Sequence, residues 1–170
     1  LRTLLPRLRP GVYKADFNPV AFSWYCHLSL NRAVRISLLW PIINSSQVLK
    51  FLYFRTMGAR VEFGLNTSLD VRFADLPLVR IGKGTTLSEG VQISCHTFVG
   101  DRLLLKPVTI GRNVFIGMNC TIGPATEIGD RCWIGMENIL GINRLPEDTK
   151  LDDFVWQHRS PKPSNLTELR

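Results

Sequence analysis

Residues 110–141 decide the fold of this chain, and they read IGRNVFIGMNCTIGPATEIGDRCWIGMENILG. An aliphatic residue followed by glycine returns every six positions, at Ile110, Ile116, Ile122, Ile128, Ile134 and Leu140. Small or β-branched residues stand four positions later, at Val114, Cys120, Thr126 and Cys132. A period of six matches neither the helical period of about 3.6 nor the strand period of about 2. It predicts a short strand plus a corner, and three such units close a triangular coil of about eighteen residues.

The same pattern extends upstream of this stretch. Aliphatic residues continue the period at Ile81, Leu87, Ile93 and Val99, with a fainter start at Phe63, Leu69 and, in the same phase, Asp75. We therefore predict a parallel β-helix over residues 61–143, in which the aliphatic residues fill the axis and the glycines permit tight turns. The general rule for parallel crossovers favours a right-handed coil.

Composition sets the limits for the rest of the chain. Its 170 residues, 45% of them apolar and 21% charged, suit one folded domain and exclude a chain that is disordered throughout. Nine basic side chains and one acid lie in residues 1–60, against twelve and thirteen in residues 61–170. The two parts are built differently.

Several classes of protein do not fit the sequence. A membrane-spanning helix is not expected, because no run of about 18 uncharged apolar residues exists. The chain opens on Leu-Arg-Thr without an initiator methionine or a signal peptide, which suggests a piece of something longer. The four cysteines show no CxxC spacing, so neither a zinc site nor a disulfide framework is indicated, and a reducing compartment fits best.

The N-terminal part, residues 1–60, reads as a basic arm followed by apolar helices. Residues 1–15 are expected to be extended, and Asn18-Pro19 is a plausible start for a helix over 20–38. After Pro41, a second helix is expected at about 45–57. Aromatic and basic side chains together favour a membrane interface or an acidic lipid surface, and the part is too apolar for a nucleic-acid groove. The helices could equally cap the first coil, and we expect both roles; residues 144–170 are predicted to form an irregular tail.

His96 is the strongest candidate for chemistry. It stands fourth in its hexad, which predicts an outward side chain, and the register breaks beside it, because Val99 and Ile110 are eleven residues apart instead of twelve. A segment is therefore extruded or shortened next to an imidazole that can act as a general base near neutral pH. The alternative is a surface histidine without a role. His27 and His158 are expected to be structural or solvated, and no histidine pair has metal-ligand spacing, so no metal is expected.

Two side-chain stripes follow from the eighteen-residue coil. Phe115 and Trp133 are one coil apart, as are Met118 and Met136, and Phe98 is expected to continue the aromatic row. The stripes predict either an apolar groove for a pantetheine arm or a packing face for a neighbouring β-helix, and we favour the packing face. The alternative without a function is that they are ordinary apolar patches on the surface.

Three further residues have alternative interpretations. Asp75 stands where the repeat expects an aliphatic residue, so either the chain loops out there, which we favour, or the carboxylate faces a pocket and holds the amine of an acceptor. Lys106 either contacts phosphates of a donor or is simply solvated. Cys95 precedes His96 and points to the opposite face of the strand, so we interpret it, like Cys120 and Cys132, as a packing residue rather than a nucleophile.

The repeat resembles that of the hexapeptide-repeat acyltransferases. The stretch from Ile93-Ser-Cys-His96 to Lys106-Pro-Val-Thr-Ile-Gly is similar to the segment around the catalytic histidine of galactoside and maltose acetyltransferases. Residues 5–13, Met57-Gly-Ala-Arg-Val61 and Leu76-Pro-Leu-Val-Arg-Ile-Gly82 resemble more narrowly the tandem C-terminal domains of polylysine-synthetase-like non-ribosomal peptide synthetases.

This resemblance implies a left-handed β-helix and an active site between adjacent β-helices, in a trimer or pseudo-trimer. It implies an acyl or aminoacyl transferase in which His96 takes the proton of an amine or hydroxyl acceptor. The donor would be acyl-coenzyme A or a thioester on a carrier protein. The protein would be located at the cytoplasmic side of a membrane. The chain departs from family members that bind coenzyme A, because Met118 and Met136 replace small residues and Gly141-Ile142 replaces a Thr-Lys pair. The rival hypothesis is a non-catalytic assembly module.

Overall fold

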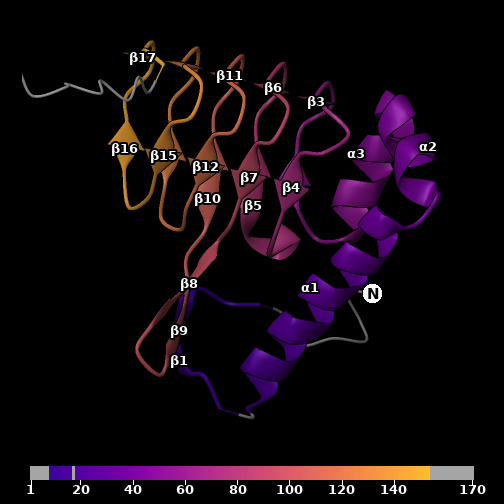
Figure 1. Cartoon of the computed structure of the whole chain (residues 1–170), viewed down its shortest axis with the longest axis vertical. Coiled ribbons are helices and arrows are strands. Elements are labelled where there is room, and N and C mark those ends of the chain that lie inside the picture. Colours follow the sequence, from indigo (N-terminus) through magenta and orange to yellow (C-terminus); the bar gives the residue numbers. More distant parts are fainter. Residues whose placement is uncertain (1–7, 17, 154–170) are drawn as a thin grey trace, which may run out of the picture.

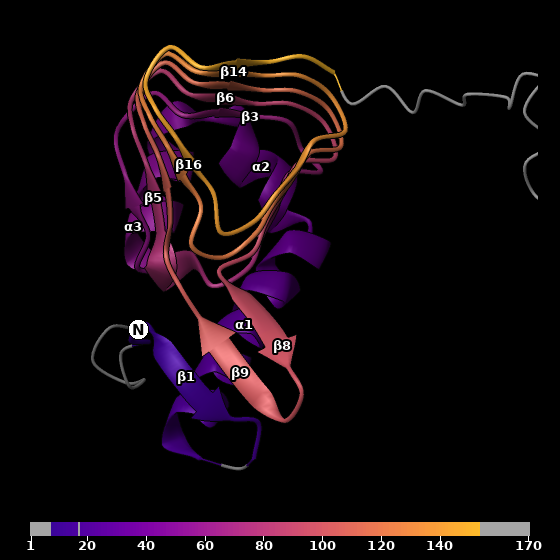
Figure 2. The same cartoon turned by 90° about the vertical axis from the view of Figure 1, so that its left-hand side faces the viewer.

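A parallel β-helix forms most of the chain, in a computed structural model that describes residues 8–16 and 18–153. Its short strands stack along three faces, and Figure 2, which looks along the stack, shows the rungs superimposed as a triangular outline. The first face holds β2 (Arg60–Val61), β5 (Val79–Ile81), β10 (Val108–Ile110), β13 (Glu127–Ile128) and β16 (Arg144–Leu145). The second holds β3 (Asn66–Thr67), β6 (Thr86–Leu87), β11 (Phe115–Ile116), β14 (Trp133–Ile134) and β17 (Lys150–Leu151). The third holds β4 (Arg72–Phe73), β7 (Gln92–Ile93), β12 (Thr121–Ile122) and β15 (Ile139–Leu140).

The six-residue period therefore predicted the class of fold correctly. Aliphatic side chains of each rung lie in register with those of the next, as in the parallel pairs of Ile116 with Leu87 and with Ile134. These side chains are buried and fill the interior of the prism. The stack continues through β16 and β17, past residue 143, where the sequence predicted its end.

The glycine of the repeat has a different role from the one expected. The residues with left-handed backbone recur every six positions at Gly84 and Gly90 and then at Asn113, Asn119, Ala125, Arg131 and Glu137, so most corners are turned without glycine. At Gly117, which follows Ile116, a Cβ atom would lie 2.8 Å from the backbone of Gly135 in the next coil. The repeat therefore needs glycine because successive coils approach closely there.

This close approach gives a matched test of stability. We expect Gly117→Ala to lower the free energy of unfolding by about 1–3 kcal/mol, because the added methyl group must push two coils apart. Gly141→Ala at the equivalent hexad position is the control: nothing lies within 4 Å of its Cβ, so a change below about 0.5 kcal/mol is expected. Urea denaturation followed by circular dichroism measures both. Equal losses in the two variants would contradict the role assigned to the stacking glycine.

Two insertions shift the register of the repeat. The coil that begins with β2 gains a short 3-10 helix, Leu76–Leu78, so its inward residues pair as Val61 with Ile81 and Phe73 with Ile93. The faint phase predicted from Phe63, Leu69 and Asp75 is therefore wrong, and Phe63 and Leu69 are exposed.

The second insertion is the segment extruded beside His96. It is an antiparallel hairpin of β8 (His96–Val99) and β9 (Arg102–Leu105), and the coil resumes where the Lys106 N–H donates to the Cys95 carbonyl. Val99, expected on the axis, lies near the hairpin tip and is 64% exposed. The basic arm contributes β1 (Gly11–Lys14), which pairs with β9 as a third strand.

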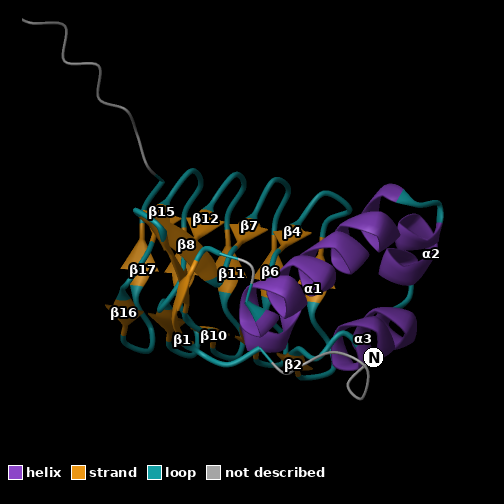
Figure 3. Ribbon diagram, turned by 90° about the horizontal axis from the view of Figure 1, so that it is seen from below, coloured by secondary structure: helices purple, strands orange, loops and turns teal. Residues whose placement is uncertain are grey.

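Three helices cover the N-terminal end of the prism (Figures 1 and 3): α1 (Pro19–Ile36), α2 (Leu39–Ser45) and α3 (Gln47–Thr56). The side chain of Asn18 caps α1 as expected, by accepting from the N–H groups of Val20 and Ala21. The sequence did not predict α2. Pro41 is tolerated there because it lies in the first turn, where a backbone N–H has no partner within the helix.

The helices seal the open edge of the first coil. The N–H groups of Arg72 and Ala74 donate to carbonyls of the second coil. The carbonyls of the residues that alternate with them along the first coil therefore point away from the second coil, toward the helices. Side chains of α1 and α2 donate to these carbonyls in turn: Asn31 to Phe73 and Arg35 to Val71 at 2.5 Å, Trp40 to Leu69 at 2.5 Å, and Asn44 to Thr67 at 3.3 Å. The capping role predicted for these helices therefore has a hydrogen-bonded basis.

The membrane role of the helices stays a prediction. Large apolar side chains remain exposed on them, notably Ile36, Leu38, Leu39 and Ile42. Among residues 8–16 and 18–153, no helix has the length and hydropathy needed to cross a bilayer.

Candidate active site

His96 lies where three parts of the fold meet. It is the first residue of the extruded hairpin, it follows the third-face strand β7, and α1 packs beside it. Its side chain is 21% exposed, so the ring is reachable from outside yet held by its neighbours. The outward orientation predicted for His96 agrees with this position, while the adjacent Cys95 is fully buried.

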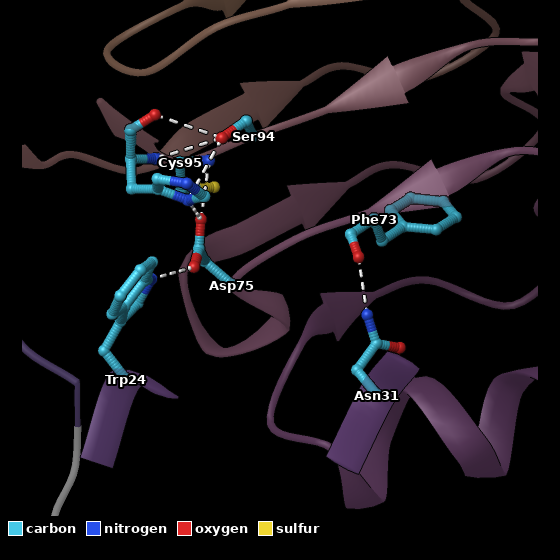
Figure 4. A network of polar contacts seen from close by, with 7 residues as sticks. Trp24, Asn31, Phe73, Asp75, Ser94 and Cys95 are labelled. Carbon is cyan, nitrogen blue, oxygen red and sulfur yellow. Dashed lines mark hydrogen bonds and ion pairs between the residues drawn. The ribbon is translucent and has the colours of Figure 1, made fainter. Parts of the chain in front are cut away.

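A buried carboxylate holds the imidazole. His96 Nδ1 lies 2.6 Å from Asp75 Oδ2, which also accepts the backbone N–H of Cys95 at 3.0 Å. The other oxygen, Oδ1, accepts the indole N–H of Trp24 at 2.6 Å (Figure 4). Three donors therefore surround the two oxygens of a carboxylate whose side chain has no exposure to solvent, so its hydrogen-bonding needs are met within the chain.

The placement of Asp75 corrects the sequence-based interpretations. The residue has left-handed backbone (φ 58°) immediately before the 3-10 helix, so the chain does depart from the repeat there. The carboxylate nevertheless turns inward and is not solvated as a loop residue would be. Both oxygens accept hydrogen bonds from donors of the chain itself. Asp75 therefore positions His96, whereas the sequence suggested that its carboxylate could hold the amine of an acceptor.

Aromatic rings complete the wall around the imidazole. The Trp24 ring centroid lies 5.0 Å from that of His96 and 5.8 Å from that of Phe98, in edge-to-face arrangements. Phe98 itself lies 6.2 Å from His96 on the hairpin. It therefore belongs to the histidine cluster and does not continue the row of Phe115 and Trp133, because the extruded hairpin carries it out of the coil.

The tautomer of His96 follows from these contacts. A carboxylate accepts hydrogen bonds, so the proton of the neutral imidazole lies on Nδ1 and the lone pair on Nε2. Ser94 Oγ lies 3.2 Å from Nδ1 and donates to the His96 carbonyl at 3.1 Å, which further restrains the residue. Nε2 forms no hydrogen bond with any residue that the structure describes, so it is free to accept a proton.

A groove of about 620 Å³ adjoins the histidine. It lies between α1 and the third face of the prism. Leu28 and Ile36 of α1 give it an apolar wall, and His96 and Ser94 line it together with Arg32, Arg35 and Arg72. Its size is that of a pocket for a small organic molecule.

The other predicted site residues lie elsewhere. Phe115 stacks on Trp133 at 5.8 Å and 15° on the second face, with Lys150 above the Trp133 ring. Met118 and Met136 are 43% and 38% exposed. Lys106 is exposed at the foot of the hairpin. The stacking predicted for the aromatic pair is confirmed, but neither stripe lines the groove at His96.

Cys95 is a packing residue, as predicted. Burial raises the pKa of its thiol, and the nearby charge of Asp75 adds to that effect. The thiolate needed for nucleophilic attack is therefore disfavoured. Cys120 and Cys132 are also buried, in small-residue positions of the repeat. In the part of the chain that the structure describes, no three His, Cys, Asp or Glu side chains gather in a way that could hold a metal ion.

Sequence reasoning missed Trp24 and the arginines of the groove. Trp24 appeared only as one of several aromatic residues of an apolar helix, and no local pattern distinguished it. Arg32 and Arg72 are far apart in the sequence and come together only because α1 packs along the third face.

His27 provides a pH-dependent feature of α1. Its Nδ1 is buried without a hydrogen-bond partner among the described residues. Burial lowers the pKa of His27, and the charge of Asp75 opposes this shift more weakly. Because the unfolded chain then binds a proton more readily than the folded one, stability should fall as the pH drops through about 6.5, the value for a free histidine.

We therefore expect the melting temperature to decrease between about pH 7.5 and 5.5, and His27→Gln to reduce that decrease. Calorimetric scans of both proteins at the two pH values measure the effect. An unchanged pH slope in the variant would show that His27 does not cause it.

Comparison with known proteins agrees with the fold and the repeat. Residues 107–141 match a family described as the hexapeptide repeat of succinyl-transferase. A Bacillus subtilis (strain 168) protein, YvoF, named as an acetyltransferase whose activity is unproven, is 28% identical over 98 residues. The match spans 57% of this chain and 56% of that relative, so the chain aligns with little more than half of the relative's length.

Solved structures show the same architecture. A maltose O-acetyltransferase from Clostridium difficile 630 superposes with a TM-score of 0.63 at 18% identity, over 86% of this chain and 89% of that one. The hexapeptide-repeat acetyltransferase VCA0836 of Vibrio cholerae O1 biovar eltor, solved with acetyl-coenzyme A, gives a TM-score of 0.50 at 15% identity, over 86% and 90% of the two chains. Residues 107–141 thus carry a hexapeptide repeat, and the fold is the β-helix seen in these hexapeptide-repeat acetyltransferases.

Proposed function

We propose that this chain is an acyltransferase domain that moves an acyl group from a thioester to an amine or hydroxyl acceptor, with His96 as the general base. One observation carries the proposal: the 2.6 Å contact between His96 Nδ1 and the buried carboxylate of Asp75, which leaves the Nε2 lone pair available beside a groove. A histidine without a role would not require a carboxylate to be desolvated and held by three donors.

The chemistry follows from this geometry. The acceptor oxygen or nitrogen attacks the carbonyl carbon of the thioester and forms a bond to it while His96 Nε2 takes the acceptor proton. The resulting imidazolium is stabilised by its contact with the Asp75 carboxylate. The tetrahedral intermediate then breaks its C–S bond, and Nε2 returns the proton to the sulfur. The products are an ester or amide and a free thiol, with the histidine restored.

For the donor, we propose acyl-coenzyme A or an acyl group on the pantetheine of a carrier protein, as in peptide synthetases. The acetyl-coenzyme A bound to the Vibrio cholerae structure supports the first source. Met118 and Met136, in place of small residues, support the second. The two stripes, Phe115 with Trp133 and Met118 with Met136, are proposed to pack against the groove of a neighbouring β-helix, in a trimer or a tandem array.

The test is release of free thiol in the presence of acceptors. The protein is incubated with acetyl-coenzyme A or with an acetylated carrier protein, together with a panel of amines and alcohols, and thiol and acylated acceptor are measured. Acceptor-dependent thiol release above the level of a His96→Ala variant supports the proposal. Equal product formation by the two proteins would contradict it and would favour the non-catalytic assembly module.

A further inference from the structure

The groove beside His96 carries an unbalanced positive charge. Three of its lining side chains are the guanidinium groups of Arg32, Arg35 and Arg72, and no Asp or Glu lines it. Asp70 lies near Arg35 and acts on its charge only weakly, and its Oδ2 accepts the backbone N–H of Gly90. The groove therefore holds cations that its own walls do not neutralise.

The three arginines are not equivalent. Arg35 is committed to the fold, because it donates to the carbonyls of Val71 and Asp70 and lies 5.6 Å above the Trp40 ring. Burial, and after it the positive charge of Arg72, lowers the pKa of Arg35. Arg32 and Arg72 are exposed and form no ion pair with any described residue. These two are available for a ligand.

Their positions place a ligand between them and the histidine. Arg72 stands on β4, in register with Gln92 on β7, and His96 follows β7 by three residues. Arg32 lies one helical turn from both Leu28 and Ile36, which also line the groove from α1. An anion held by the two guanidinium groups therefore shares one small, partly apolar groove with His96.

We propose that the acceptor carries an anionic group, a carboxylate or a phosphate, which Arg32 and Arg72 bind while its amine or hydroxyl lies at His96. This inference rests on the proposed transferase function and adds the class of acceptor to it. Guanidinium groups bind both anions through paired, charge-assisted hydrogen bonds. A phosphate of the donor is the competing source of charge, but a pantetheine arm separates those phosphates from the thioester that must reach His96.

Kinetics with matched acceptors tests the assignment. Each pair differs only in charge, for example glucosamine and its 6-phosphate, or an amino acid and its amide, so the pairs separate phosphate from carboxylate. We expect the anionic member of at least one pair to be preferred, and the Arg32→Gln/Arg72→Gln double variant to raise KM for it about tenfold or more with little change in kcat. The corresponding double lysine variant should recover part of the affinity, and Arg144→Gln, on the first face, serves as the control.

The outcomes decide between the sources of the anion. An increase in KM for acetyl-coenzyme A and not for the acceptor would overturn the proposal, as would equal rates for charged and uncharged acceptors. Binding is also measured without catalysis, as the increase in melting temperature caused by inorganic phosphate and by acetate. Stabilisation retained by His96→Ala and lost in the double glutamine variant supports the anion site even if no acceptor is acylated. Equal stabilisation of wild type and double variant overturns it.

Discussion

Replacing His96 with alanine is expected to lower the rate of acyl transfer by a factor of roughly 10²–10⁴, the usual contribution of a positioned general base. The loss should appear in kcat, because the imidazole acts on the proton that leaves the acceptor as the new bond forms. Stability should fall by about 1–3 kcal/mol as well, because the buried Asp75 carboxylate loses one of its three donors, so the rate is measured at a temperature where the variant is fully folded. Thiol release with saturating donor and acceptor measures the effect.

His27→Gln is the matched control for this variant. His27 also lies near Asp75, on α1, but it has no hydrogen bond to the carboxylate. We expect its removal to leave kcat within about twofold, well below the effect of a general base. Similar losses in both variants would mean that packing around α1, and not proton transfer at His96, supports the activity.

Replacing Asp75 with asparagine is expected to lower kcat by a factor of about 10² or more, although the side chain keeps its size. Three donors converge on the carboxylate, from Trp24, Cys95 and His96. An asparagine has only one oxygen acceptor, and its NH₂ group must face one of these partners. If it faces His96, Nδ1 must accept, the proton moves to Nε2 and the base is lost. If it faces Trp24, the buried indole N–H loses its acceptor.

The same substitution should also reduce stability, by roughly 1–3 kcal/mol, because a buried hydrogen bond is left unmade. The kinetic readout separates positioning from stability: kcat falls at a temperature where the variant is fully folded, and KM for the acceptor changes little. Asp130→Asn is the control, because Asp130 also accepts a backbone N–H, that of Arg112 at 2.7 Å, but lies away from the groove. An Asp75→Asn enzyme with wild-type kcat would refute the role assigned to the carboxylate.

The fold was predictable because its signal is periodic and local. Each hexad from Ile110 to Leu140 contributes one inward aliphatic residue, and the stacking of these residues fills the prism. His96 was also predictable, because the register breaks beside it. The histidine cluster was not, since it depends on how two insertions and a helix meet in space.

Asp75 illustrates the limit. In the sequence it interrupts a faint repeat, and its partner lies 21 residues away in a hairpin that leaves the coil. The two-residue shift caused by the helix Leu76–Leu78 moves Asp75 from the axis to a corner beside Cys95. Trp24 and Arg32 reach the site only through the docking of α1, for which Asn31 and Arg35 supply hydrogen bonds. These contacts join distant parts of the chain, and no local pattern encodes them.

Because α1 and α2 seal the first coil, the two ends of the β-helix differ in whether another coil can be added. Asn31, Arg35, Trp40 and Asn44 use up the outward carbonyls of residues 67–73, so no further rung can be added or paired there. Lengthening by whole turns, or shortening, is compatible with the architecture only at the opposite end. Coils can therefore be gained or lost at the C-terminal end of the β-helix, while the capped first coil and the histidine site beside it keep their structure.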